Sequence, residues 1–105
     1  MEYLQQLDAS LDHSELLDAL EVLDSEGIEL VTVKHRVDIA RRILGRNPDR
    51  YSIVVANSPE FTAVNIVIRA RETLQNLYQL NQELASLAGV EKDSVLNILF
   101  GRATA

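Results

Sequence analysis

Residues 62–68 read TAVNIVI, and this stretch decides between two architectures. Just before it, Ser58-Pro59-Glu60 combines a capping hydroxyl, a first-turn proline and an acid, which is typical of a helix start. Apolar residues then recur at helical spacing, at Ala63, Val67, Ala70, Leu74 and Leu77. This pattern predicts a long helix over residues 59–79. The same stretch is rich in β-branched residues, which favour strands, so an α+β alternative stays open for the middle of the chain.

Two amphipathic helices are predicted closer to the N-terminus. The first covers residues 14–26, with Ser14 as its cap, a leucine stripe on one side and Gly27 at its end. The second covers residues 35–45 and ends at Gly45. Residues 2–10 are compatible with a further short helix. Residues 28–33 and 51–56 are β-favouring, and pairing between them would give a small two-stranded sheet.

The C-terminal stretch 83–102, ELASLAGVEKDSVLNILFGR, reads as two helices joined at a short turn. It has a small residue where the helices would cross, a glycine in the turn and apolar residues on the inner side. These positions are Ala85, Gly89, Val90, Val95 and Ile98. On these residues the segment 81–102 resembles the helix-turn-helix of the lambda-repressor and Cro-like families. The resemblance implies a mainly α fold, a helical domain with a C-terminal helix-turn-helix, with a two- or three-stranded β element left open in residues 28–68.

In those families the second helix enters the major groove of DNA. Carried onto this chain, the resemblance implies DNA contacts from Lys92, Ser94, Asn97 and Arg102. The chain departs from the family pattern at Glu91 and Asp93, because carboxylates there would repel phosphate. Phosphate contacts are therefore also expected from a basic segment, through Arg41, Arg42, Arg46 and Arg50.

The formal net charge of −6 is unevenly distributed over a chain of 105 residues, a length that predicts a single domain. Residues 1–33 hold nine acids and no lysine or arginine, residues 34–50 carry a net charge of +4, and residues 51–105 carry −1. We divide the domain into an acidic arm and helix (1–33), a basic helix and connector (34–58), and a long helix with the helix-turn-helix (59–105). The acidic face of residues 14–26 is either solvated or meets a basic partner, which is residues 34–50 or another protein.

Several kinds of chemistry have no support in the sequence. There is no cysteine, the two histidines do not form a metal-ligand pattern, and the four glycines are isolated, so neither a metal nor a cofactor is expected. No nucleophile motif occurs, which argues against an enzyme. The acidic N-terminus and the short apolar runs predict neither a secretory signal nor a membrane span, so a cytoplasmic location is expected.

Two functional hypotheses follow from these patterns. The first is a small sequence-specific DNA-binding regulator, with a dimer favoured because one short reading helix gives little affinity. The second is a helical, oligomerising interaction or assembly protein with no nucleic-acid role, in which the acidic face of residues 14–26 meets a basic partner.

Overall fold

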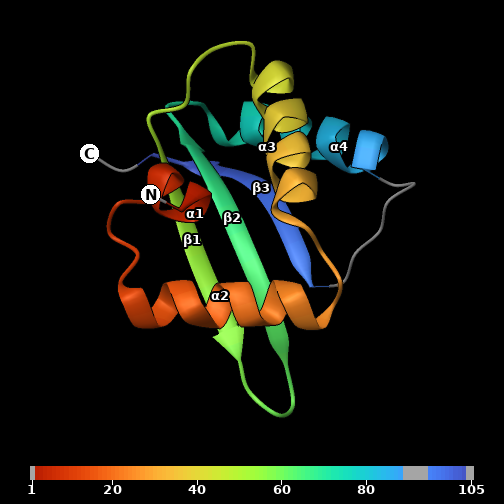
Figure 1. Ribbon diagram of the computed structural model, residues 1–105. Coiled ribbons are helices and arrows are strands. Elements are labelled where there is room, and N and C mark those ends of the chain that lie inside the picture. The colour runs from red at the N-terminus through yellow and green to blue at the C-terminus, as the bar shows by residue number, and fades with distance from the viewer. Residues whose placement is uncertain (1, 89–94, 104–105) are drawn as a thin grey trace.

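The computed structural model describes residues 2–88 and 95–103, which form four helices and three strands (Figure 1). In chain order these are α1 (Tyr3–Leu7), α2 (His13–Ser25), α3 (Leu30–Leu44), β1 (Arg50–Asn57), β2 (Thr62–Ala70), α4 (Leu74–Ala88) and β3 (Leu96–Arg102). The strands form one mixed sheet, in which β2 pairs antiparallel with β1 and parallel with β3. The fold is therefore α/β, and the prediction of a mainly helical domain with a C-terminal helix-turn-helix is wrong. Among the described helices, none is long and apolar enough to cross a membrane.

Helices α2 and α3 correspond to the two helices predicted in the N-terminal half. A reciprocal capping box starts α2: the Glu15 N–H donates to the Asp12 carboxylate at 2.7 Å, and the Asp12 N–H donates to the Glu15 carboxylate at 3.4 Å. The cap is thus Asp12 and not Ser14. Helix α3 ends at Gly45, whose φ of 77° is a left-handed conformation that glycine adopts readily. The sequence leaves residues 28–33 open as a strand or an extended connector; α3 begins at Leu30, so the strand and its pairing with residues 51–56 do not form.

Strand β2 replaces the long helix predicted over residues 59–79. Ser58 and Phe61 exchange backbone hydrogen bonds of 2.9 and 3.2 Å, so residues 58–61 form the turn between β1 and β2. Serine at the first position and Pro59 at the second suit a β-turn as well as a helix start. The TAVNIVI run then forms the central strand, which is buried along most of its length. Its apolar residues are nearly continuous, as in strands whose side chains are buried on both faces of the sheet: Val64, Ile66 and Ile68 on one face, and Ala63 and Val67 on the other.

Helix α4 and strand β3 take the place of the predicted helix-turn-helix. Residues 81–88, predicted as a separate first helix, are the C-terminal half of α4. The predicted reading helix is a strand over Leu96–Arg102, and it lies parallel to β2 with Ile66 opposite Ile98. A strand places Leu96, Ile98 and Phe100 on one face of the sheet, where all three pack into the core. The turn predicted around Gly89 lies outside the described residues.

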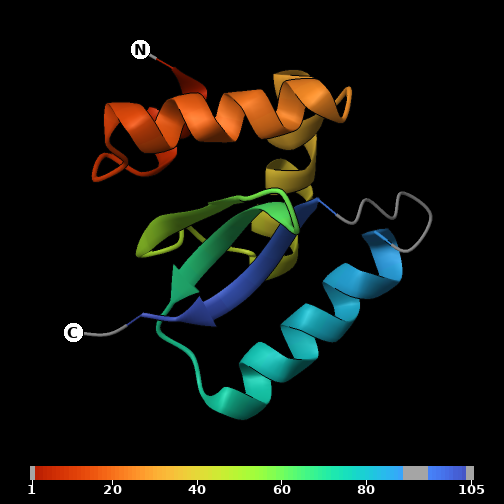
Figure 2. The same ribbon diagram turned by 90° about the horizontal axis from the view of Figure 1, so that it is seen from below.

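The helices pack against one face of the sheet. The buried apolar side chains between the helices and this face form two clusters. The strand residues that contact the helices share one parity along each strand: Tyr51, Ile53, Val55, Val64, Ile66, Ile68, Leu96, Ile98 and Phe100. Helices α1 and α2 and the first half of α3 cover one part of this face, and α4 with the end of α3 covers the rest. Figure 2 shows α2 above the strands and α4 alongside β3. No residue of the opposite parity belongs to either cluster within the described ranges.

Side chains cover backbone groups at both edges of the sheet. At the β1 edge, the Ile53 N–H donates to a carboxylate oxygen of Asp8 at 2.9 Å. At the β3 edge, the Phe100 N–H donates to Asn81 Oδ1 at 2.8 Å, and Asn81 Nδ2 donates to the Phe100 carbonyl at 3.0 Å. Asn81 thus provides the donor and the acceptor that a further strand would bring. Exposed edges invite pairing with another chain, and these contacts oppose it.

Candidate functional site

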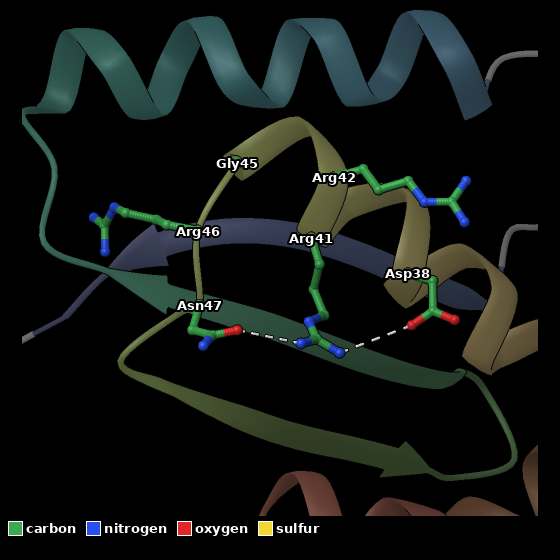
Figure 3. Close-up of a pocket in the computed structure, with 6 residues that line it drawn as sticks. All are labelled: Asp38, Arg41, Arg42, Gly45, Arg46 and Asn47. Atoms are coloured by element: carbon green, nitrogen blue, oxygen red, sulfur yellow. Dashed lines mark hydrogen bonds and ion pairs between the residues drawn. The ribbon is translucent and has the colours of Figure 1, made fainter.

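The arginines predicted to bind phosphate lie around the C-terminal end of α3, where residues 38–47 line a cavity of about 520 Å³ (Figure 3). Arg41 lies between Asp38, at 3.9 Å, and the Asn47 side-chain oxygen, at 3.3 Å. Figure 3 shows the guanidinium groups of Arg42 and Arg46 pointing away from Arg41 in opposite directions. The three side chains therefore do not converge on one point.

Arg46 is held by acids of the same region. Its guanidinium donates to Glu72 at 3.1 Å and to the Arg71 carbonyl at 3.1 Å, and it lies 3.8 Å from Asp49. The hydrogen bonds from Asn76 and Arg46 hold the pKa of Glu72 below its ordinary value. The acidic partners of Arg41 and Arg46 are thus Asp38, Asp49 and Glu72, which lie outside α2 and its acidic face. Arg41 and Arg42 lie in the last turn of α3, where positive charge interacts favourably with the helix dipole. This interaction explains their position without requiring a bound ligand.

The remaining predicted DNA contacts lie elsewhere in the fold. Arg50 is the first residue of β1 and stands opposite Arg69 of β2. Asn97 and Arg102 are exposed residues of β3, and Asn97 donates to the Asn65 side chain at 3.0 Å. Lys92 and Ser94 lie outside the described residues. The structure therefore separates Asn97 and Arg102, on the sheet, from Arg41 and Arg42, on α3.

A groove between the second half of α2 and the connection to α3 has a volume of about 950 Å³. We call it the acidic groove. Its lining residues combine apolar side chains with acids: Leu17, Leu20, Glu21, Leu23, Asp24, Gly27, Ile28, Glu29 and Leu30. Leu23 at its base is buried, whereas Leu17 at its rim is 52% exposed. The groove thus exposes Leu17, and in part Leu20, Ile28 and Leu30, beside its acids.

The charged residues that line this groove in the described part of the chain are all acids. Among residues 2–88 and 95–103, no hydrogen bond or ion pair involves the side chains of Glu21, Asp24 or Glu29. Other acids of α2 do have internal partners: Glu15 belongs to the capping box and Asp18 accepts a 3.4 Å hydrogen bond from Asn57. The acids that line the groove are therefore available to an external cation.

The sequence shows the acids of this groove but not the groove itself. The stripe of Glu15, Asp18, Glu21 and Asp24 was predicted as one face, and the structure divides it into two acids with local partners and two that line the groove. The groove also depends on the turn after α2, where Gly27 has a φ of 69° and Ile28 contributes to the wall. Residues 28–33 were expected as a strand or an extended connector, so this wall was not foreseen.

Comparison of the chain with protein-family models, curated proteins and solved structures gives no match. Function is therefore inferred from the geometry and charge of the surfaces described above.

Proposed function

We propose that this protein is an interaction module whose acidic groove binds a basic, partly apolar segment of a partner protein. The observation that carries the proposal is that exposed and half-exposed leucines of the groove lie beside three acids, Glu21, Asp24 and Glu29, whose side chains have no partner among the described residues. A segment with apolar side chains flanked by lysine or arginine fits both properties. An amphipathic helix in a groove is a recurrent way of meeting such a surface.

The two parts of the groove have different roles in binding. Fully burying an exposed leucine-sized side chain contributes about 1.5–3 kcal/mol, so covering Leu17 and the half-exposed apolar side chains beside it supplies most of the affinity. An exposed ion pair contributes only about 0.2–1 kcal/mol, but complementary charge raises the association rate and rejects partners of the wrong sign. The acids therefore select basic segments and make binding sensitive to salt.

The helix-turn-helix mode of DNA binding is not carried forward, because its expected reading helix contains strand β3. The groove also disfavours nucleic acid, since its acids would repel phosphates. The second hypothesis, an interaction protein without a nucleic-acid role, agrees better with the acidic groove. The partner segment is here assigned a chemistry, basic and apolar, but not an identity.

Calorimetric titration with a synthetic peptide tests the proposal. The probe is an amphipathic helical peptide of leucine and lysine, and its matched control has glutamate at every lysine position. We expect the lysine peptide to bind, with an affinity that falls as salt is raised, and the glutamate peptide not to bind. Glu21→Lys and Asp24→Lys should each weaken binding about fivefold, which corresponds to about 1 kcal/mol.

The matched control is Glu83→Lys, because Glu83 is an exposed acid on α4 and gives the same change in net charge. It should leave the affinity nearly unchanged. Leu17→Asn should weaken binding without a change in charge, since it removes an exposed apolar side chain at the rim of the groove. The proposal fails if both peptides bind alike, or if Glu83→Lys weakens binding as much as Glu21→Lys. Circular dichroism of each variant confirms that the fold is retained.

A further inference from the structure

The face of the sheet opposite the helices, which we call the open face, is a second surface of the molecule. Its residues alternate along each strand with those that contact the helices: Arg50, Ser52, Val54, Ala56, Ala63, Asn65, Val67, Arg69, Asn97, Leu99 and Gly101. On the central strand, Ala63 and Val67 of this face are already buried. Val54 is 55% exposed and Leu99 is 38% exposed, so apolar side chains of both outer strands face solvent. This face lies on the other side of the sheet from the helices that form the acidic groove.

An asparagine pair lies in the middle of the open face. Asn65 and Asn97 stand opposite each other on β2 and β3, and Asn97 Nδ2 donates to Asn65 Oδ1 at 3.0 Å. An amide side chain has two N–H donors and an acceptor oxygen, so the pair keeps unused capacity of both kinds. A second copy of the same pair offers the same donors and acceptors. Such a pair is therefore self-complementary.

Arg69 lies across one end of the open face. Its Nε donates to Ser52 Oγ on β1 at 3.2 Å, and its Nη1 donates to the Arg102 carbonyl on β3 at 3.4 Å. Gly101 leaves room for this conformation, because a Cβ there would lie 2.9 Å from Arg69 Nη1. The Arg69 guanidinium thus bonds to groups on both outer strands, and this end of the open face is positively charged. The opposite end of β2 leads into the turn that carries Glu60.

We propose that the open face packs against the open face of a second copy, related by a two-fold axis that lies between the two sheets and crosses the strands at Asn65. This axis brings the asparagine pairs of the two copies together. It also places the Arg69 end of each copy opposite the turn with Glu60 of the other, because Asn65 lies about midway between them along the chain. Charge and hydrogen bonding are therefore both complementary in this arrangement.

The edges of the sheet favour this mode over strand addition. Asp8 covers an N–H of β1, and Asn81 occupies both outward backbone groups of Phe100 on β3. Joining two sheets edge to edge would require these hydrogen bonds to be broken, whereas face packing leaves them in place. Two sheets packed face to face lie about 10 Å apart with their side chains interdigitated.

The size of the open face predicts a weak dimer. Three strands spaced about 4.8 Å apart, with seven to nine residues each, cover roughly 15 by 25 Å. This area is below the roughly 800 Å² per partner of a standard stable interface. We therefore expect a dimer that forms at micromolar or higher concentration and dissociates on dilution. The acidic grooves stay outside this interface, so a dimer would present two of them.

Sedimentation velocity over a concentration series measures this equilibrium. The unaltered chain should change from monomer to dimer as concentration rises, and Val54→Glu and Leu99→Glu should each raise the dissociation constant at least tenfold. The controls are Val31→Glu on α3 and Leu74→Glu on α4, at side chains that are 66% and 69% exposed outside the open face. These controls should dimerise like the unaltered chain.

Chemical cross-linking tests where the two-fold axis of the proposed dimer crosses the strands. The chain has no cysteine, and Val54 stands opposite Asn65 on the proposed axis, so a single Val54→Cys substitution provides one reactive position per copy and leaves the asparagine pair intact. Facing sheets about 10 Å apart are too distant for a disulfide, so a short bismaleimide reagent is used. Val54→Cys should give a cross-linked dimer, and Val31→Cys should not. A chain that stays monomeric at millimolar concentration, or a dimer insensitive to Val54→Glu and Leu99→Glu, would overturn the proposal. Peptide binding in the groove is measured separately and does not depend on this result.

Discussion

Asp8 joins the N-terminal segment to the edge of the sheet. Burial by itself raises the pKa of this carboxyl, but the hydrogen bonds from Ser10 and from the Ile53 N–H, together with the charge of Arg50, outweigh burial and lower the pKa. A carboxyl whose pKa is lower in the folded chain than in the unfolded chain stabilises the fold at higher pH. That contribution is complete above the unfolded pKa of about 4 and is lost as the pH falls through the folded value.

We therefore expect Asp8→Asn to remove part of the acid sensitivity of folding. At pH 7, Asp8→Ala should lower the free energy of unfolding by about 1–2 kcal/mol, because the Ile53 N–H loses its acceptor. The difference between the unaltered chain and Asp8→Asn should shrink as the pH falls below about 4. Urea denaturation at a series of pH values measures both effects. Ser10→Ala, which removes only one hydrogen bond to Asp8, should show a smaller change of the same sign; a pH-independent difference would contradict this account.

Gly101 is required by its neighbours and not by its backbone conformation. A Cβ at this position would lie 2.6 Å from Val67 Cγ1 and 2.9 Å from Arg69 Nη1. We expect Gly101→Ala to lower the free energy of unfolding by about 1–3 kcal/mol, the usual effect of overpacking. In a double-mutant cycle, Val67→Ala should relieve part of this loss, because it removes the closest atom. Additive effects of the two substitutions would show that the contact with Val67 is not the cause.

At the scale of elements, α4 holds the outer edge of β3 through one side chain. Asn81 satisfies both the N–H and the carbonyl of Phe100. Asn81→Ala should lower the free energy of unfolding by about 1–3 kcal/mol and speed hydrogen exchange at the Phe100 amide more than at Leu99. Gln79→Ala, an exposed amide on the same helix, is the matched control and should have little effect. Equal acceleration at Phe100 and Leu99 would instead indicate general loosening of the strand.

The elements differ in how far the sequence predicts them. Amphipathic spacing and terminal glycines predicted α2 and the end of α3 correctly, because one face of each helix is buried and the other is exposed to solvent. In contrast, TAVNIVI and LNILF are apolar at nearly every position, so helical spacing can be found within strands that are buried by their neighbours. These segments form strands because β3 pairs with β2, although α4 separates the two in the sequence. Such a long-range contact leaves no local pattern in the sequence.

The candidate site was predicted to a smaller extent than the fold. The acids of α2 are visible in the sequence, but the groove beside them depends on the angle at which the chain leaves α2 near Gly27. The arginines of residues 41–50 form one basic segment in the sequence, and Figure 3 shows that the end of α3 directs Arg41, Arg42 and Arg46 apart. Charge composition therefore indicated two surfaces, and the backbone geometry determined which one forms a groove.

At the scale of the whole molecule, the single sheet separates two surfaces of different character. The helical side carries the acidic groove, and the opposite side is the open face with its asparagine pair. Binding of a basic segment on one side and of a second copy on the other would make the protein a bivalent adaptor. Two linked grooves bind a partner with repeated basic segments more tightly than one groove does.

The most direct test of the central claim is nuclear magnetic resonance of the isotopically labelled chain during titration with the leucine–lysine peptide. The amide signals of residues 17–30 should shift most, and the shifts should saturate and diminish as salt is raised. The glutamate peptide should leave the spectrum unchanged. Shifts concentrated at residues 38–47 or on the strands, or no shifts at millimolar peptide, would contradict binding in the acidic groove.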